Sequence, residues 1–234
     1  MQRVKQLVAS LKSQDVGTRD GSMVELAELL STKVSEDRQK LVSAIVYAGP
    51  DLIMTLTACA REMKRNADRV FLNVCDLLVL LGPSLQGIDS LPLRDMAACA
   101  AEVASHLAST VPSIPEAAAK ALLGLMQSNN PEVMAAVYRS SSREIMSVCK
   151  AAVNTESVAN CLQCVACMAT VAGVGSQNTI QEILPTVARL CGRPGKMGEV
   201  ATRTVLQALV CFPELTSTTV LTSRNLATLI NNIR

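Results

Sequence analysis

The chain is almost without aromatic side chains. Its 234 residues include no tryptophan, two tyrosines and two phenylalanines, so aromatic residues make up 2% of the sequence. β-Sheets are rich in aromatic and β-branched residues, and proteins that bind single-stranded nucleic acid stack its bases on aromatic rings. The composition therefore argues against a sheet architecture and against single-strand binding by stacking.

The chain also has only one histidine and a small net charge. The single histidine, His106, excludes enzymes whose sites are built from several histidines. Within its predicted helix only Glu102 lies one turn away, so we expect a structural histidine rather than a general base. The formal net charge is +2, which is too small for a strongly electrostatic nucleic-acid binder.

Apolar residues and cysteines are abundant instead. The hydrophobic share is 49% and the charged share is 18%, which excludes a disordered chain. Most of the nine cysteines lie in apolar helical patterns, and we expect them to be reduced and buried, as in proteins of the cytoplasm or nucleus. Charges recur every few residues in Met1–Lys12, so no signal peptide is expected there. The apolar stretch Val158–Val174 is only about 17 residues long, at the lower limit of a membrane span, and we expect a buried helix.

One amphipathic pattern recurs along the chain. Each copy begins with an acidic residue, continues with apolar residues at helical spacing, and ends in an apolar turn. The copies are Asp20–Leu30, Asp68–Leu78, Glu116–Met126, Glu156–Met168 and Glu199–Val210, and their starts are 48, 48, 40 and 43 residues apart. A period near 40–47 residues is typical of repeats built from two or three helices. The sequence therefore predicts an all-α repeat protein.

Partner helices are expected between these copies. They are Val34–Ala48, Pro50–Lys64, Pro92–Ser109, Pro131–Val153 with a break near Ser140–Ser142 left open, Gln177–Cys191, and a last helix at Ser223–Ile233. Proline is tolerated in the first turn of a helix, which supports the starts at Pro50 and Pro131. Because no linker or shift in composition interrupts the pattern, we expect residues 1–234 to form a single helical-repeat domain.

In period and pattern, nearly the whole chain resembles the armadillo/HEAT class of α-solenoids. The resemblance implies a right-handed α-solenoid of about five repeats and, by analogy, a scaffold or adaptor rather than an enzyme. Armadillo proteins that clamp extended peptides carry ladders of tryptophan and asparagine. In the fourth copy those positions fall near Gln163 and at Cys167. The clamp of nuclear-import adaptors is therefore not expected, and neither is the tryptophan-based contact of tubulin-binding HEAT arrays.

Three cysteines, Cys161, Cys164 and Cys167, form a C-x2-C-x2-C run. Such spacing can hold an iron–sulfur cluster or part of a zinc site, although both need a loop around the metal and a fourth ligand. Here the run lies within a helical pattern and drifts slowly around one helix face. We therefore expect a stripe of small core residues and no metal or cofactor, with a redox or metal role as the alternative.

Two basic clusters are the candidate partner-binding residues. The first consists of Arg61, Lys64, Arg65 and Arg69, and the second of Arg139, Arg143 and Lys150. Residues three or four apart share one face of a helix, so the first cluster could contact an acidic partner. The second cluster lines one side of its helix if that helix is continuous, and it could then meet an acidic or phosphorylated peptide. The alternative for both is a solvated helix face.

Taken together, these patterns predict a non-catalytic protein–protein interaction scaffold or adaptor. We expect it to bind a helical or extended segment of another protein. A membrane and nucleic acid are not expected as ligands. The alternative is a cytoskeleton- or nucleic-acid-associated helical-repeat array that binds an acidic surface through the two basic clusters. Self-association through an end of the array is left open.

Overall fold

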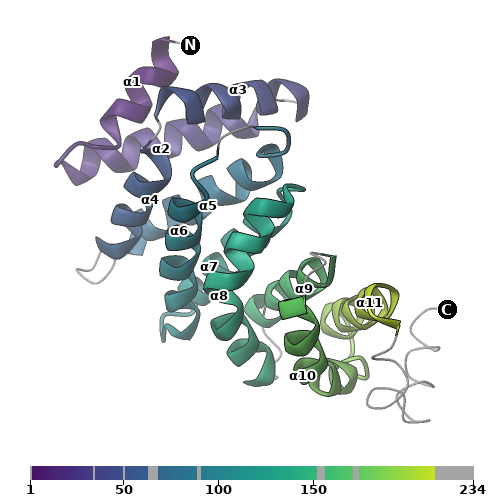
Figure 1. The fold of residues 1–234 in the computed structure, drawn as a ribbon. Coiled ribbons are helices and arrows are strands. Elements are labelled where there is room, and N and C mark those ends of the chain that lie inside the picture. Colours follow the sequence, from purple (N-terminus) through teal and green to yellow (C-terminus); the bar gives the residue numbers. More distant parts are fainter. Residues whose placement is uncertain are drawn as a thin grey trace. The chain divides into compact units, whose positions relative to one another are not determined.

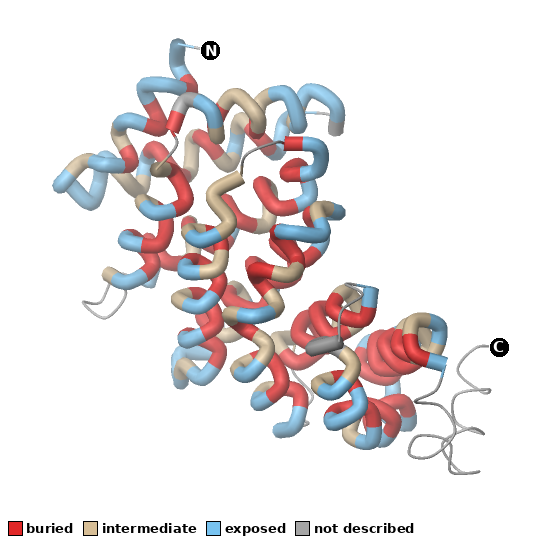
Figure 2. The backbone as a smooth tube through the Cα atoms, in the orientation of Figure 1, coloured by how far each residue is buried: buried red, intermediate tan, exposed pale blue. Residues whose placement is uncertain are grey.

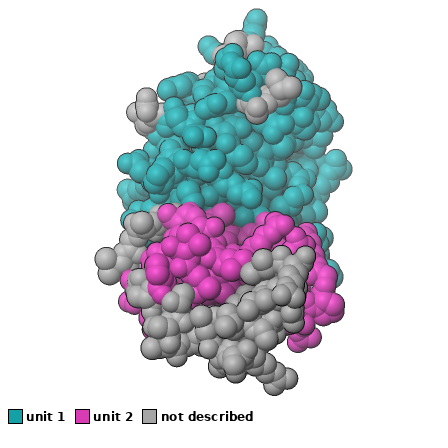
Figure 3. Space-filling model, turned by 90° about the vertical axis from the view of Figure 1, so that its right-hand side faces the viewer, with its two compact units in different colours: residues 1–141 teal, residues 142–234 magenta. Residues whose placement is uncertain are grey.

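The computed structural model describes residues 2–33, 35–49, 51–62, 68–88, 91–151, 156–170 and 174–213. Within these ranges all regular secondary structure is helical. The chain divides into two compact units, residues 1–141 and residues 142–234 (Figure 3). Each unit is described by itself, and the expectation of a single domain over 1–234 stays a prediction.

The first unit is built from two sets of stacked helices. Its helices are α1 (Gln2–Ser10), α2 (Val16–Ser31), α3 (Ser35–Ala48), α4 (Leu52–Arg61), α5 (Asp68–Leu81), α6 (Leu93–Ser105) and α7 (Ser113–Met126). Helix α5 packs on α2 and on α7, and α4 packs on α6 (Figure 1). Helices α2, α5 and α7 therefore form one layer, in which each helix packs on the next.

The second unit contains the C-terminal part of α8 (Pro131–Ala151), followed by α9 (Glu156–Thr170), α10 (Val174–Leu190) and α11 (Lys196–Cys211). Helix α11 packs on both α9 and α10. The hydroxyl of Thr204 on α11 is buried and donates to the carbonyl of Leu162 on α9 at 3.0 Å. This bond links the two helices within a largely apolar contact.

The five copies of the amphipathic pattern are confirmed as helices. They lie in α2, α5, α7, α9 and α11, and their apolar spacing matches the buried side of each helix (Figure 2). The partner helices correspond to α3, α4, α6, α8 and α10, whereas the expected helix Ser223–Ile233 lies outside the described residues. The local pattern thus located ten of the described helices, α2 to α11.

Helix starts follow the local chemistry of the sequence. The carboxylate of Asp15 accepts a hydrogen bond from the backbone N–H of Thr18 at 2.7 Å and caps α2. The hydrogen bond from the Thr18 hydroxyl, and then this backbone bond, lower the pKa of Asp15. At α8, the Asn130 side chain accepts from the N–H groups of Glu132 and Val133 at 3.1 and 3.3 Å. Both side chains satisfy backbone donors that have no partner within the helix.

Helix α8 runs without interruption through Ser140–Ser142, so no break occurs there. The Ser141 hydroxyl donates to the carbonyl of Val137 at 2.7 Å, and the Ser140 hydroxyl donates to the carbonyl of Ala136 at 3.0 Å. Serine can satisfy its hydroxyl in this way on the preceding turn. The serine cluster therefore continues the helix, although its composition is typical of a loop.

Two glycines allow α5 and α7 to approach closely. Gly82 directly follows α5, and a Cβ placed on it would lie 2.1 Å from the carbonyl oxygen of Gly124 on α7. A Cβ on Gly124 would in turn lie 2.8 Å from the Cα of Val79. The backbones of the two helices therefore meet where neither residue can carry a side chain.

A partly buried ion pair joins α2 to the end of α4. The guanidinium of Arg19 donates to both carboxylate oxygens of Glu62, at 2.9 and 2.5 Å. Its side chain is 11% exposed and that of Glu62 is 32% exposed. The pair connects residues 43 positions apart and holds the first repeats of the unit together.

In the described part of the chain, no single helix has the length and apolar character needed to cross a membrane. One bent pair, residues 36–47 with residues 52–61, passes that test of length and composition when its two helices are taken together, with an angle of 83° between them.

Candidate functional site

The first basic cluster does not assemble as a free cationic patch in the described residues. The Nε of Arg61 donates to the Glu102 carboxylate on α6 at 2.8 Å. The Nε of Arg69 lies 2.9 Å from the Asp20 carboxylate on α2. Lys64 and Arg65 lie outside the described residues. Two of the four cations thus already contact a carboxylate of a neighbouring helix, and their role in partner binding stays a prediction.

The second basic cluster lies on the exposed side of α8. Arg139, Arg143 and Lys150 are all exposed, and Lys150 forms an ion pair with Glu182 on α10. Arg143 and Lys150 line a groove of about 430 Å³ between α8 and α10. Since α8 is continuous, the predicted alignment along one helix side is confirmed for this cluster, whereas its partner role stays a prediction.

The cysteine run belongs to the core of the second unit. Cys161 and Cys164 are fully buried within α9, and Cys167 is half-buried. Burial raises the pKa of the Cys164 and Cys167 thiols, which keeps them protonated and weakly nucleophilic. In the described residues no group of three potential ligands is arranged to hold a metal ion. The interpretation of this run as small core residues is confirmed for Cys161 and Cys164.

His106 also lies within the core. It is buried, and its ring meets Phe71 edge-on with 4.5 Å between the ring centroids. Its Nε2 lies 3.8 Å from a carboxylate oxygen of Glu102. These contacts join the end of α6 to α5 and suit a structural histidine.

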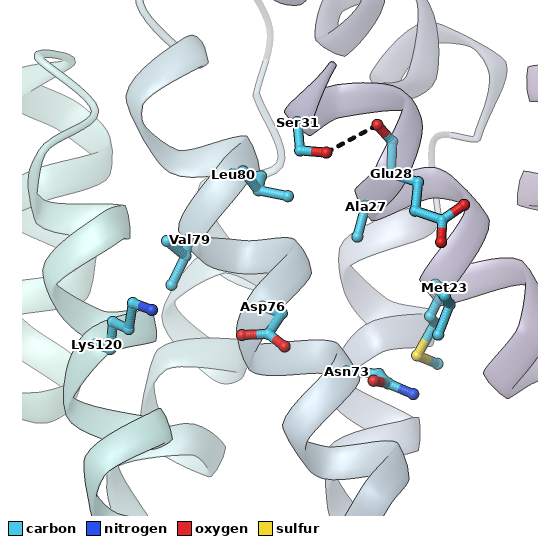
Figure 4. Close-up of a pocket in the computed structure, with 10 residues that line it drawn as sticks. Met23, Ala27, Glu28, Ser31, Asn73, Asp76, Val79, Leu80 and Lys120 are labelled. Carbon is cyan, nitrogen blue, oxygen red and sulfur yellow. Dashed lines mark hydrogen bonds between the residues drawn. The ribbon is translucent and has the colours of Figure 1, made fainter. Parts of the chain in front are cut away.

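A groove on the layer of α2 and α5 is the site that sequence reasoning missed. It has a volume of about 350 Å³ and is lined by α2 and α5, with one residue from α7. Its apolar side chains are Met23, Val24, Ala27, Val79 and Leu80, and its polar ones are Glu28, Ser31, Asn73, Asp76 and Lys120 (Figure 4). All of these residues belong to the first unit.

Two carboxylates give this groove its charge. Glu28 on α2 and Asp76 on α5 are exposed, and neither forms an ion pair with any described residue. By contrast, the nearby Asp20 is paired with Arg69 and accepts a hydrogen bond from Asn73. Together with Lys120, the groove lining therefore carries two negative charges and one positive charge.

The two carboxylates occupy the same position in consecutive repeats. Glu28 and Asp76 are 48 residues apart, which is also the separation of the starts Asp20 and Asp68. The corresponding position of the third copy is Gly124. The signal was thus present in the sequence, but it becomes a site only once α2 and α5 are known to be neighbours.

Comparisons with known proteins place the fold. No protein-family model matches the sequence, and no curated protein matches it. An engineered protein from a structural genomics consortium is similar to the entire chain, with a TM-score of 0.70, 17% identity and 97% of that chain covered. A designed armadillo repeat protein is similar with a TM-score of 0.68 and 12% identity, covering 99% of this chain and 100% of that one.

A second designed armadillo repeat protein, solved in complex with the peptide (KR)4, is similar with a TM-score of 0.65 and 12% identity over 99% of both chains. Likeness at these identities shows the fold alone. The chain has an armadillo-like helical-repeat fold, and the expectation of an all-α solenoid is confirmed.

Proposed function

We propose that the chain is a non-catalytic protein-binding scaffold that holds a segment of a partner protein in the groove between α2 and α5. The observation that carries this proposal is the groove itself, where apolar side chains of α2 and α5 lie beside exposed polar and charged side chains. One structurally similar designed armadillo protein was solved with a bound peptide, which supports the same kind of ligand here.

The lining of the groove suits a polypeptide segment rather than a small molecule. Val24, Ala27, Val79 and Leu80 offer apolar contact. The side-chain oxygens of Asn73 and Ser31 can accept hydrogen bonds from a peptide backbone. Pockets for small ligands bury most of the ligand surface in a concave cavity, whereas this groove follows the surface of neighbouring helices. Extended segments are recognised on such grooves through a few side-chain anchors.

The other expectations from the sequence fit this proposal. The nine cysteines are all free thiols, so we propose a reducing location such as the cytoplasm or nucleus. Catalysis is not part of the proposal, since His106 and most thiols contribute to packing. The leading proposal includes neither a membrane nor nucleic acid as a ligand.

Filling the groove tests the proposed function. Ala27→Trp adds a large side chain to the groove lining, and we expect it to reduce the amount of bound partner at least about tenfold, equivalent to about 1.4 kcal/mol. The measurement is affinity capture of partners on the full chain, followed by quantitative mass spectrometry. Ala98→Trp on the exposed side of α6 is the matched control. Equal capture by both variants and the wild type would contradict the assignment of this groove.

A binder of acidic surfaces is the second candidate, because Arg143 and Lys150 line the groove between α8 and α10. This candidate predicts that Arg139→Glu with Arg143→Glu weakens binding to microtubules or duplex DNA, and that wild-type binding falls steeply between 50 and 200 mM salt. Co-sedimentation and fluorescence anisotropy measure the two ligands. Lys5→Glu with Lys33→Glu, both exposed and outside α8, is the control. If the reversed α8 variant and this control bind alike, the α8 face is a solvated surface.

A further inference from the structure

We infer that the exposed side of α11, in the second unit, is the docking site of residues 223–233 of the same chain, which pack on it as an amphipathic helix. The inference goes beyond the proposed function, because it concerns a different helix and an intramolecular partner. It is carried by the apolar end of α11, by the residue pattern of 223–233 and by the short distance that the chain has to bridge.

The exposed side of α11 begins with charged residues. Lys196, Glu199 and Arg203 are all exposed there. Lys196 forms an ion pair with Glu156 on α9, and Arg203 forms one with Glu199 at 2.6 Å. This first part is typical of a helix face in contact with water, and its charges already have partners within the chain.

Apolar side chains replace these charges in the last two turns of α11. Val210 is 76% exposed, the largest exposed fraction among the large apolar side chains of the described residues. Leu206 lies one turn before it, and Leu206, Leu209 and Cys211 are half-buried. One exposed apolar residue is common on a protein surface. These four residues lie within one short stretch, however, and form a patch that favours a covering partner.

The described helices packed on α11 contact its other side. Helices α9 and α10 both pack on α11, and Ala201 and Ala208 are fully buried. At 3.6 residues per turn, Val210 and Ala201 point in opposite directions, because they are two and a half turns apart. In the first unit, α5 has a neighbour in its layer on each side, α2 and α7. The patch on α11 is thus open to a further helix.

Residues 223–233 have the pattern of such a helix, although they lie outside the described residues. Their large apolar residues recur at i, i+3, i+4 and i+7, which places them on one helix face. They are Leu226, Leu229, Ile230 and Ile233. The opposite face is polar and consists of Arg224, Thr228, Asn231 and Asn232. The segment therefore has one face to bury, and docking on the patch removes both apolar surfaces from water.

The chain can readily bring this segment to the patch. Helix α11 ends at Cys211, and the described residues end at Pro213. At about 1.5 Å per residue, the patch lies within about 10 Å of that end. Residues 214–222 can span about 30 Å when extended, whereas packed helices need only about 8–10 Å between their axes. Attachment gives the segment a high effective concentration, which favours it over a separate molecule.

Alkylation of Cys211 tests the docking on the full chain. Cys211 is a free thiol at the patch, and Leu226→Asp with Ile230→Asp places two charges on the apolar face of the segment. We expect this variant to raise the rate at which N-ethylmaleimide modifies Cys211 at least about tenfold. Peptide mass spectrometry measures the rate. Cys167, a half-buried thiol on α9, is the internal control and should react at an unchanged rate.

A matched variant places the same charges on the opposite face of the segment. Thr228→Asp with Asn232→Asp has the same spacing and should leave the Cys211 rate within about twofold of the wild type. Equal rates for the two Asp variants would overturn the inference. So would a Leu226→Asp, Ile230→Asp protein in which Cys211 reacts as slowly as in the wild type.

A synthetic peptide of residues 223–233 tests the contact through a gain of protection. Added to the full-length Leu226→Asp, Ile230→Asp protein, it should slow the modification of Cys211 again at about 1 mM, a concentration similar to that of a tethered segment. A folding defect cannot mimic this recovery. No protection at that concentration, or equal protection by a peptide with the same two Asp substitutions, would contradict the docking.

Light scattering after size-exclusion chromatography distinguishes the contact from one with a second copy of the chain. A monomeric wild-type protein supports the intramolecular contact. If the wild type is a dimer and Val210→Asp makes it monomeric, a second copy covers the patch and the inference is wrong.

Discussion

Gly82→Ala is expected to lower the free energy of unfolding by about 3 kcal/mol. The new Cβ would lie 2.1 Å from the carbonyl oxygen of Gly124 and 2.4 Å from its carbonyl carbon. Both are backbone atoms of α7, so no side chain can rotate away and the helices must separate. Gly124→Ala acts on the same contact from the other side, at 2.8 Å from the Cα of Val79. Urea unfolding of the full chain, followed by circular dichroism, measures both.

Gly21→Ala is the matched control for this contact. Gly21 lies inside α2, is exposed, and has no atom within 4 Å of its ideal Cβ. Alanine should raise the free energy of unfolding there by about 0.5–1 kcal/mol, because it favours the helix and restricts the unfolded chain. The changes in the free energy of unfolding caused by Gly82→Ala and by Gly21→Ala should thus have opposite signs. A Gly82→Ala protein as stable as the wild type would show that α5 and α7 do not meet in this way.

Glu62→Gln is expected to lower the free energy of unfolding by about 2–3 kcal/mol. The change removes the charge that faces the guanidinium of Arg19, whose side chain is only 11% exposed. Leaving a buried cation without its partner costs several kcal/mol, and the partial exposure of Glu62 reduces this cost. Urea unfolding of the full chain again provides the measurement.

Two further variants show whether burial of the Arg19–Glu62 pair causes this loss of stability. Glu36→Gln removes an exposed partner of Lys40, with 79% of the Glu36 side chain exposed, and should change the free energy of unfolding by about 0.5 kcal/mol or less. Arg19→Met combined with Glu62→Leu removes both charges and should recover most of the loss. An equal effect of Glu62→Gln and Glu36→Gln would indicate that the Arg19–Glu62 pair is solvated.

The repeat pattern was enough to predict the helices of the five copies and their partner helices. Apolar residues at helical spacing and acidic first turns located α2, α5, α7, α9 and α11, because burial of one helix side imposes that spacing directly. The continuity of α8 depended instead on hydrogen bonds from Ser140 and Ser141 to the preceding turn. Composition alone does not show whether a serine hydroxyl bonds within a helix or ends it.

The candidate site was harder to predict than the fold. Clusters of like charge are visible within one stretch of sequence, which is why Arg139, Arg143 and Lys150 were identified. The carboxylates of Glu28 and Asp76 are 48 residues apart, and they become neighbours only through the stacking of α2 on α5. Equally, the sequence could not show that Arg61 and Arg69 contact Glu102 and Asp20, since those partners lie on other helices.

The distribution of thiols gives the helices built-in chemical reporters of local opening. Cys75 on α5, Cys99 on α6 and Cys164 on α9 are buried, and burial raises the pKa of the Cys99 thiol to about 11. Such thiols react with an alkylating reagent only when their helices separate. The rate at which each cysteine is modified therefore reports how often the helices around it separate. No cysteine has to be introduced for this measurement.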